Sequence, residues 1–458
     1  MFSASKMLPG VRSVVVIGAG YVGLTLSVFL ASRGVRTVCV ERDAERAGKI
    51  MRGHSPIHEE GLPELLKKVI REGMLEARTE LGDTLEGADI VFITVGTPTG
   101  SNGGPDLSQV EEASRQIGEA LAATKRGSPL IVVKSTVPPG TTWNIVRPII
   151  ESASGRSCGE GFHLCVNPEF LREGSALQDT ITPDRIVIGA KHGVASEKLV
   201  RFYEALYQPA KIPTLITTPS NAELIKLATN AFLALKISFI NLISQLCESL
   251  EDGDVGVVAE GLGLDPRIGP LFLRAGLGFG GSCLPKDLRA LKAFTSSRGV
   301  DISLLEAILN INRAQRIRVV ERAERLLGSL AGKRVAVLGL AFKPGTDDVR
   351  EAASIDVIRE LLARGAEVSV HDPVATENAR NLLDKTVHYA SSAEDCLDGA
   401  DLAIIATEWP EYASLTPNKI KTKMRNPLLI DGRRVLNPQP LEEAGIKVYT
   451  VGRSSEAV

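Results

Sequence analysis

The chain has 458 residues, of which 44% are hydrophobic and 24% charged, and its formal net charge is −2. This length exceeds one hydrophobic core and predicts about three domains, while the near-zero charge argues against nucleic acid or an anionic membrane as a partner. The six cysteines and six histidines show neither paired spacing nor a cluster, so we expect no disulfide framework and no metal site.

Two apolar segments bear on where the protein works. Residues 1–10 contain no apolar run long enough for a signal peptide. The most apolar later stretch, 231–243, is interrupted by Lys236 and is too short to span a bilayer. We therefore expect a cytoplasmic protein without a membrane partner.

An apolar strand at 14–17 runs into the glycine turn GAGYVG at 18–23, and a helical pattern follows to residue 32. The next strand, 37–40, ends on Glu41, as in a dinucleotide-binding fingerprint. The first glycine of such a turn allows the bend, the second lets the pyrophosphate approach the backbone, and the third packs the helix. The Glu41 carboxylate accepts hydrogen bonds from the ribose and repels a 2′-phosphate, which favours NAD over NADP. Arg42 and Arg46 weaken that preference without removing it.

Strands and helices continue to alternate up to residue 215. We expect strands at 88–95, 130–134, 164–166, 185–189 and 213–216, with a helix at 107–123. Polar segments follow three of these strands, at 96–99, 135–140 and 167–173, where a cofactor or substrate binds in sheets of this kind. This predicts an N-terminal Rossmann domain, 1–215.

A long helical pattern from 220 to 251 begins the central domain, 216–330, and a second helix follows at 303–330. Ser220 and Glu223 have the spacing of a capping box. Lys226 and Asn230 lie four residues apart and therefore share a helix face. Taken alone, such a pair is most simply a solvated face.

The loop between these helices, 276–287, contains four glycines, Cys283 and Asp287. Glycines allow sharp turns and close approach of a ligand, and nearby cations or backbone N–H groups favour a cysteine thiolate. The alternative is a glycine-rich loop with an incidental small apolar cysteine.

The remaining residues, 331–458, predict a second α/β domain with strands at 332–341, 367–372, 401–407 and 428–434. Its glycines do not form GxGxxG, so we expect it to bind something other than a complete dinucleotide. Arg433 and Arg434 form the carboxyl end of its last strand, where an anionic ligand would bind.

Together, seven segments resemble the UDP-glucose/GDP-mannose dehydrogenase family. They are GAGYVG, KSTVPPGT (134–141), NPEFLREG (167–174), ELIKLATNAF (223–232), GFGGSCLPKD (278–287), LAFKPGTDDVRE (340–351) and DGRRV (431–435). The resemblance covers nearly the whole chain. It implies an α/β fold of two Rossmann-like doubly wound domains, one for NAD and one for a UDP-sugar, joined by a long central helix through which a homodimer or higher oligomer forms.

The resemblance also implies roles for individual residues. Cys283 would be the nucleophile, and Lys226, Asn230, Asp287, Glu169 and Thr136 would surround the substrate's C6 and the attacking water. The cofactor residues would be Gly18, Gly20, Tyr21, Val22, Gly23, Glu41, Arg46, Thr97, Thr136, Glu173 and Arg350. The UDP-sugar would contact Phe170, Leu171, Arg172, Glu173, Lys226, Asn230, Phe279, Gly280, Phe342, Lys343 and Arg433, with Arg267 reaching a neighbouring subunit's site. Glu41 in place of the frequent aspartate, Gly96, and the 347–353 sequence depart from the family pattern and affect the cofactor contacts.

Oxidation of the sugar's primary alcohol to a carboxylate removes four electrons and therefore reduces two NAD molecules. An aldehyde gives up a second hydride only after a nucleophile has added to it, which explains the need for Cys283. Water would then release the acid, assisted by Glu169 or by a water held by Asp287, while Lys226 and Asn230 stabilise the oxyanions. The expected reaction is UDP-glucose to UDP-glucuronate.

Three alternatives remain. The first is the same chemistry on GDP-mannose or an N-acetylated UDP-hexosamine. The second is a two-electron hydroxyacid dehydrogenase, which has no need of Cys283 or of a second nucleotide-binding domain. The third is a non-catalytic NAD-sensing or scaffold protein, against which the joint presence of Cys283, Lys226, Asn230 and Asp287 argues.

Overall fold

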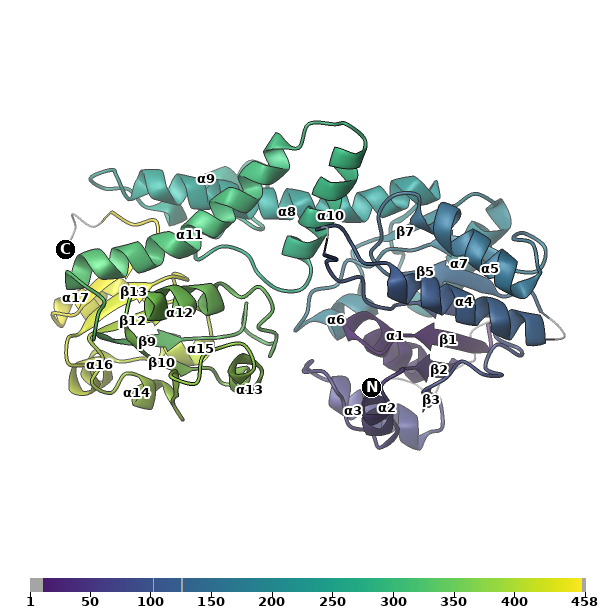
Figure 1. Ribbon diagram of the computed structural model, residues 1–458, viewed down its shortest axis with the longest axis horizontal. Helices are drawn as coiled ribbons and strands as arrows, with labels where there is room; N and C mark the ends of the chain where they lie inside the picture. The colour runs from purple at the N-terminus through teal and green to yellow at the C-terminus, as the bar shows by residue number, and fades with distance from the viewer. Residues whose placement is uncertain (1–10, 102, 125–126, 455–458) are drawn as a thin grey trace. The chain divides into compact units, whose positions relative to one another are not determined.

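The computed structural model describes residues 11–101, 103–124 and 127–454. The segment 1–10, for which we expect no signal peptide, lies outside the described residues. The chain divides into two compact units, one made of 1–229 with 289–294 and the other of 230–288 with 295–458 (Figure 1). The division into three domains at 215/216 and 330/331 stays a prediction.

The first unit is built on an eight-stranded sheet of order β3-β2-β1-β4-β5-β6-β7-β8. The strands are β1 (Ser13–Ile17), β2 (Arg36–Val40), β3 (Leu75–Arg78), β4 (Ile90–Ile93), β5 (Leu130–Val133), β6 (His163–Val166), β7 (Ile186–Ala190) and β8 (Thr214–Thr217). Neighbours are parallel except β6 and β7. Strand order reverses at β1, which is where ligands bind in doubly wound sheets.

Helices cover both faces of this sheet, which is why its central strands are apolar without alternation. In β1, Val15 and Ile17 pack into one core while Val14 and Val16 pack into the other. The covering helices are α1 (Tyr21–Ser32), α2 (Ala44–Met51), α3 (Leu62–Arg71), α4 (Ser108–Ala123), α5 (Arg147–Ser154), α6 (Ala176–Ile181) and α7 (Gly193–Tyr207), with a π-helical turn η1 (Thr142–Val146) before α5.

The second unit contains a fully parallel six-stranded sheet of order β11-β10-β9-β12-β13-β14. Its strands are β9 (Arg334–Leu338), β10 (Glu367–His371), β11 (His388–Tyr389), β12 (Leu402–Ile405), β13 (Leu428–Asp431) and β14 (Lys447–Thr450). The helices between them are α12 (Ala353–Ala363), α13 (Thr376–Arg380), α14 (Ala393–Cys396), α15 (Pro410–Ala413), α16 (Pro417–Lys423) and α17 (Pro438–Glu443). The α/β class with two Rossmann-like sheets and a long central helix is thus confirmed.

Four helices lie between the two sheets in sequence: α8 (Pro219–Cys247), α9 (Val255–Gly263), α10 (Leu284–Ser297) and α11 (Ser303–Leu327). The prediction of a capping box at the start of α8 is wrong. Glu223 is buried and its two carboxylate oxygens accept the backbone N–H groups of Gly140 (2.6 Å) and Thr142 (2.8 Å). The Asn221 N–H donates instead to Thr218 Oγ1 at 3.4 Å.

Helix α8 is also longer than the apolar stretch considered in the sequence. Within the described residues it is long and apolar enough to cross a membrane by length and composition alone. The buried core helices of soluble proteins can have the same length and apolar composition. Glu223 and Lys226 are buried charged residues of this helix.

Candidate active site

The glycine turn between β1 and α1 has the geometry expected of a dinucleotide site. Gly18 adopts φ +101°, a conformation that favours glycine. A Cβ added at Gly20 would meet no atom within 4 Å, so the backbone there is open to a ligand. At Gly23 a Cβ would lie 1.8 Å from the Gly18 carbonyl oxygen, so only glycine allows this packing. Tyr21 and Val22 begin α1, whose N-terminus favours an anion. The turn therefore fits the pyrophosphate of NAD.

Glu41, at the end of β2, lies beside this turn. Its Oε2 accepts the Ala19 N–H at 3.1 Å, and Arg46 donates from Nη2 to the Ala19 carbonyl oxygen at 2.9 Å. Arg46 Nε is also 3.7 Å from Glu41 Oε2. Arg46 therefore faces the turn and the Glu41 carboxylate. Because its guanidinium is already paired there, this basic residue can accompany Glu41 without forming a binding site for the 2′-phosphate of NADP.

Thr97 and Thr136 follow the neighbouring strands β4 and β5. The Thr97 hydroxyl donates to the Thr136 carbonyl oxygen at 2.8 Å, so the two residues meet at the carboxyl edge of the sheet. Ligands of doubly wound sheets bind at this edge.

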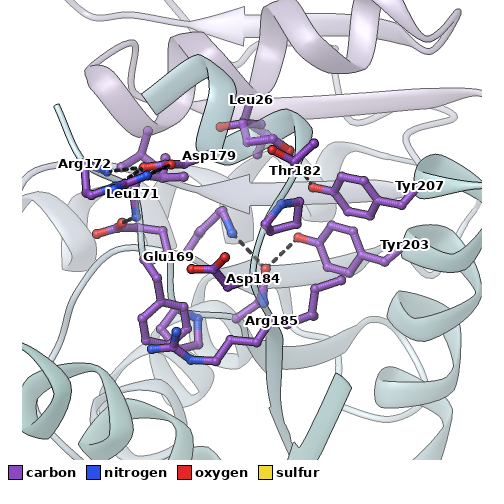
Figure 2. Close-up of a pocket in the computed structure, with 18 residues that line it drawn as sticks. Leu26, Glu169, Leu171, Arg172, Asp179, Thr182, Asp184, Arg185, Tyr203 and Tyr207 are labelled. Carbon is purple, nitrogen blue, oxygen red and sulfur yellow. Dashed lines mark hydrogen bonds and ion pairs between the residues drawn. The ribbon is translucent and has the colours of Figure 1, made fainter. Parts of the chain in front are cut away.

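The first unit contains a pocket beside Glu169 (Figure 2). Its lining brings together Val22 of α1, the predicted catalytic residue Glu169, and 170–172 of the predicted substrate segment 170–173. Arg172, although predicted to contact the sugar, donates to the Asp179 carboxylate at 2.6 and 3.1 Å. Glu173 follows it in a half-buried position.

Lys226 and Glu169 form a buried ion pair. Lys226 Nζ lies 3.0 Å from Glu169 Oε1, and Glu169 Oε2 accepts the Leu171 N–H at 2.6 Å. The Phe170 ring centroid is 5.6 Å from Nζ. Burial by itself would raise the pKa of Glu169, but the Lys226 ammonium and the Leu171 N–H, with Lys134, bring that pKa below its ordinary value. Glu169 is therefore a carboxylate at neutral pH and suits the role of a base.

A half-buried lysine, Lys134, lines the pocket that contains Glu169 and was not singled out in the sequence. Lys134 Nζ donates to Asn167 Oδ1 at 2.9 Å, which also accepts the Tyr203 hydroxyl at 2.6 Å. Burial lowers the pKa of Lys134 to about 8, with repulsion by Lys226 acting in the same direction and attraction by Glu169 opposing it. The feature of the sequence that could have pointed to Lys134 is its position directly after the buried strand β5.

In the second unit, Cys283 occupies the N-cap position of α10. Its half-buried thiol lies 3.5 Å from Ser282 Oγ. Asp287 is one turn further along α10 and is 1% exposed. Its oxygens accept Asn230 Nδ2 at 2.6 Å and Lys286 Nζ at 2.5 Å. Asn230 is one turn beyond Lys226 on α8. The shared face predicted for these two residues is thus lined with partners and buried, unlike a solvated face.

Cys283 differs from the other cysteines in its surroundings. Burial raises the pKa of Cys39 and of Cys396 to about 12. It also raises the pKa of Cys158, Cys165 and Cys247. Cys283 instead lies at a helix N-terminus, where the helix dipole favours a thiolate.

Several residues of the second unit that were predicted to bind the sugar nucleotide lie around the loop 276–287, the cysteine loop. A Cβ at Gly281 would be 2.8 Å from the Phe342 ring, and one at Gly280 would be 3.2 Å from Phe342 Cβ, so Phe342 covers the loop. Arg433 is part-buried and donates to the carbonyl oxygens of Ala406 (2.8 Å) and Gly278 (3.2 Å). Lys343 Nζ lies 5.6 Å from the Phe342 ring centroid.

Two predicted arginines are paired with aspartates outside this loop. Arg350 is 2.6 Å from Asp348 Oδ2, and its side chain is 59% exposed. Arg267 is 87% exposed and lies 2.6 Å from Asp265 Oδ2.

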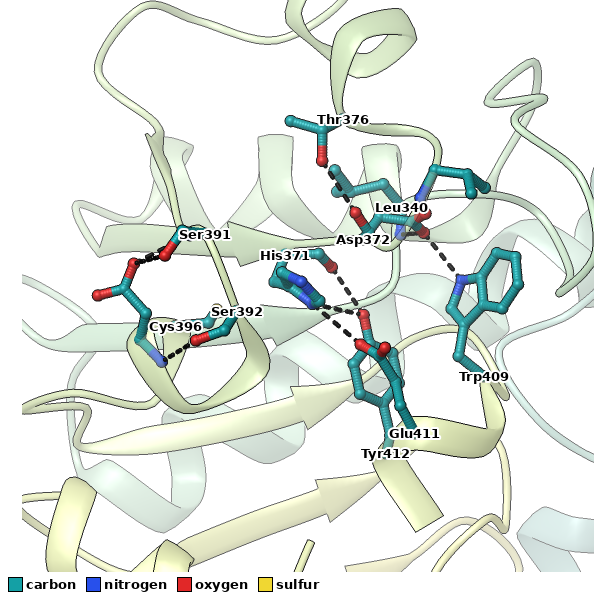
Figure 3. Close-up of polar contacts among 12 residues, drawn as sticks. Leu340, His371, Asp372, Thr376, Ser391, Ser392, Cys396, Trp409, Glu411 and Tyr412 are labelled. Carbon is teal, nitrogen blue, oxygen red and sulfur yellow. Dashed lines mark hydrogen bonds and ion pairs between the residues drawn. The ribbon is translucent and has the colours of Figure 1, made fainter. Parts of the chain in front are cut away.

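The second sheet also has a turn after β9 and an acidic residue after β10, but hydrogen bonds within the chain already occupy the oxygens of this acid (Figure 3). Asp372 follows β10, in the place that Glu41 has after β2. One of its oxygens accepts the N–H groups of Leu340 and Ala341 and the Trp409 indole N–H, at 2.7 to 3.0 Å. The other accepts the N–H groups of Val374 and Ala375. Asp372 is 4% exposed, so it cannot bind a ribose as Glu41 can.

Within 11–101, 103–124 and 127–454, no group of three or more His, Cys, Asp or Glu side chains is placed to hold a metal ion.

Comparison with known proteins gives three consecutive matches to models of one family. Residues 12–209 match the NAD binding domain of the UDP-glucose/GDP-mannose dehydrogenase family, 220–314 its central domain and 336–438 its UDP binding domain. The UDP-glucose 6-dehydrogenase TuaD of Bacillus subtilis is 41% identical over 443 residues, covering 96% of this chain and 93% of TuaD.

Solved structures agree. A UDP-glucose dehydrogenase from Pyrobaculum islandicum superposes with a TM-score of 0.91 at 40% identity, covering 99% of this chain and 100% of that one. A UDP-D-ManNAc dehydrogenase from Pyrococcus horikoshii gives 0.85 at 28% identity, covering 98% and 100%. The chain is an NAD-dependent enzyme and belongs to the UDP-glucose/GDP-mannose dehydrogenase family.

Proposed function

We propose that this enzyme oxidises UDP-glucose to UDP-glucuronate through a thiohemiacetal and a thioester on Cys283. The observation that carries the proposal is the position of Cys283 at the N-terminus of α10, one turn before a buried Asp287 that Asn230 holds. Lys226, one turn from Asn230 on α8, is paired with Glu169. A simple alcohol dehydrogenase does not need the cysteine.

NAD, when bound at the glycine turn, accepts one hydride in each of two successive oxidations. In the first, the C6 alcohol loses its proton and a hydride and becomes an aldehyde. The Cys283 thiolate then adds to the aldehyde carbon, and the carbonyl electrons move to the oxygen. Loss of the second hydride restores the carbonyl as a thioester. Water attacks this thioester and the C–S bond breaks, which regenerates the Cys283 thiolate and releases the carboxylate product.

Lys226 and Asn230 would stabilise the oxyanion at the tetrahedral steps, since each brings a donor from the same face of α8. Loss of one such donor raises the barrier by about 3–4 kcal/mol, or roughly two to three powers of ten in rate. Glu169, whose pKa lies below its ordinary value, would accept the proton of the attacking water. Asp287 would hold that water near Cys283.

UDP-glucose is proposed over other sugar nucleotides because of the relatives. The UDP-glucose dehydrogenase of Pyrobaculum islandicum is more similar to this chain in sequence and in structure than the UDP-D-ManNAc dehydrogenase is. Phe342, Lys343 and Arg433, beside the cysteine loop, would contact the nucleotide, and 170–173 would line the sugar site.

We further propose a cytoplasmic homodimer that forms through α8. Four apolar side chains of this helix lie 42–62% exposed in the chain: Phe232, Phe239, Leu242 and Leu246. Their spacing places them along one stripe of the helix. A second copy of the chain would cover this stripe, and the exposed Arg267 would then be available to the neighbouring subunit's site.

The proposed function is tested by the amount of NADH formed per UDP-glucose at completion. Two NADH per sugar in the wild type, and loss of steady turnover in Cys283→Ser, are expected. One NADH per sugar would contradict the four-electron reaction. Two NADH from GDP-mannose or UDP-N-acetylmannosamine, and none from UDP-glucose, would retain the mechanism and change the substrate.

A further inference from the structure

The backbone that leads to Cys283 is held by a side-chain amide of α11. Asn312 Oδ1 accepts the Phe279 N–H at 2.8 Å, and Asn312 Nδ2 donates to the Phe279 carbonyl oxygen at 3.0 Å. Both polar groups of one residue in the loop are thereby paired with a single side chain. Asn312 is 6% exposed, so water does not compete for these hydrogen bonds.

Two neighbours of Asn312 on the same face of α11 hold the same loop. Arg316 donates from Nη2 to the Phe279 carbonyl oxygen at 2.6 Å and is paired through Nη1 with Asp356 of α12. Gln315 Nε2 donates to the Gly276 carbonyl oxygen at 3.0 Å. All three side chains are buried. Together they donate hydrogen bonds to the carbonyl oxygens of Gly276 and Phe279, the two ends of the segment 276–279.

The fit between Asn312 and the loop also explains a glycine. Gly278 adopts φ +94°, and a Cβ there would lie 2.3 Å from Asn312 Oδ1. The amide therefore occupies the space that a side chain would need. The pairing of Asn312 with the loop is close enough to exclude a single added carbon atom.

We propose that Asn312 is a positioning residue that fixes the 276–281 loop so that the Cys283 sulfur can reach the aldehyde carbon; this inference rests on the proposed function. Phe279 lies four residues before Cys283, and two glycines stand between them. Glycines do not restrain the backbone, so the pairing at Phe279 sets where the loop begins its turn. Attack requires the reacting atoms to approach about 3–3.5 Å, and an error of about 1 Å lowers the rate by up to about 100-fold.

This role predicts an effect on one half of the reaction only. The first oxidation, from alcohol to aldehyde, does not use the sulfur. The second begins with formation of the C–S bond and therefore depends on the loop. A residue that merely stabilises the fold would slow both oxidations together, whereas a positioning residue slows the second.

The experiment is a single turnover of UDP-glucose with excess enzyme and NAD, following NADH in time. For Asn312→Ala we expect a first oxidation within about twofold of the wild type and a second slowed at least about tenfold, with the aldehyde trapped by hydroxylamine. Asn310→Ala, an exposed asparagine of the same helix, is the matched control and should leave both phases unchanged.

Asn312→Asp is the second variant, in case the alanine variant does not fold. It retains an acceptor for the Phe279 N–H and loses the donor to the carbonyl oxygen, so the second phase should again slow selectively. Equal slowing of both phases, or none, in a folded variant would overturn the positioning role while leaving the proposed function intact. A yield of one NADH per sugar from the wild type would contradict both the positioning role and the proposed function.

Discussion

Lys134 lies beside two buried charged residues, and its own charge changes near pH 8. Its Nζ is bonded to Asn167, and Glu169 and Lys226 are the other charges that act on it, with Cys165 of β6 and Tyr203 of α7 close by. Because burial lowers the pKa of Lys134 to about 8, its charge is lost as the pH rises through about 8. The field at Glu169 therefore depends on this lysine.

Lys134→Met should remove an inflection near pH 8 from the pH dependence of kcat. It should also flatten the stability profile above pH 8. A lysine whose folded pKa is lowered favours folding fully above its unfolded pKa, and this contribution is lost as pH falls toward 8. Urea unfolding at several pH values between 7 and 10.5 measures this, with the exposed Lys211→Met as control. An unchanged inflection in Lys134→Met would assign it to another group.

At the scale of elements, α8 brings together residues of unlike kinds. Its buried face contains Glu223, Lys226 and Asn230, and its exposed stripe consists of large apolar side chains. Burying such a stripe in a dimer would stabilise association by about 25 cal/mol per Å² of apolar area, before the cost of association is subtracted.

Phe239→Glu should therefore shift the protein toward the monomer, because it places a charge within the proposed interface. Sedimentation velocity over a range of concentrations measures the effect. Leu382→Glu, which introduces the same charge at an exposed leucine near α13, should leave association unchanged. A Phe239→Glu protein that sediments like the wild type would place the interface elsewhere.

The elements show where prediction from sequence succeeds and where it fails. The strand, turn, helix and acid around Gly18 and Glu41 are local in sequence, and the structure has them as expected. The role of Glu223 was mistaken because its partners, Gly140 and Thr142, lie about 80 residues away. Lys134 and Asn312 were missed for the same reason, since only tertiary packing brings their hydrogen-bond partners to them. Arg433 was expected to face a ligand, and its hydrogen bonds to the cysteine loop also depend on packing.

For the whole molecule, the acidic residue after the second strand of each sheet distinguishes the two Rossmann-like halves. Glu41 is placed beside an open glycine turn, whereas Asp372 is bonded on both oxygens to its own turn and to Trp409. The shared strand order β3-β2-β1-β4 and β11-β10-β9-β12 thus carries an acid beside an open turn in the NAD-binding half, whereas Asp372 has both oxygens hydrogen-bonded within its own half.

Calorimetry should accordingly measure one NAD bound per chain. Glu41→Ala should weaken NAD binding, because the ribose loses its acceptor. Asp372→Asn should leave the NAD affinity unchanged while lowering the melting temperature, because one oxygen that accepts N–H groups becomes an amide that cannot. A loss of NAD affinity in Asp372→Asn without loss of stability would contradict this assignment.

The contrast among the six thiols has a practical consequence. Five of them have a pKa raised by burial, and the sixth lies at a helix start within the cysteine loop. A mild alkylating reagent at neutral pH should therefore label this chain at one position, and mass spectrometry should locate the label on Cys283. Such a reagent would count functional sites in a preparation, and a uridine-bearing electrophile would act as a covalent probe for them.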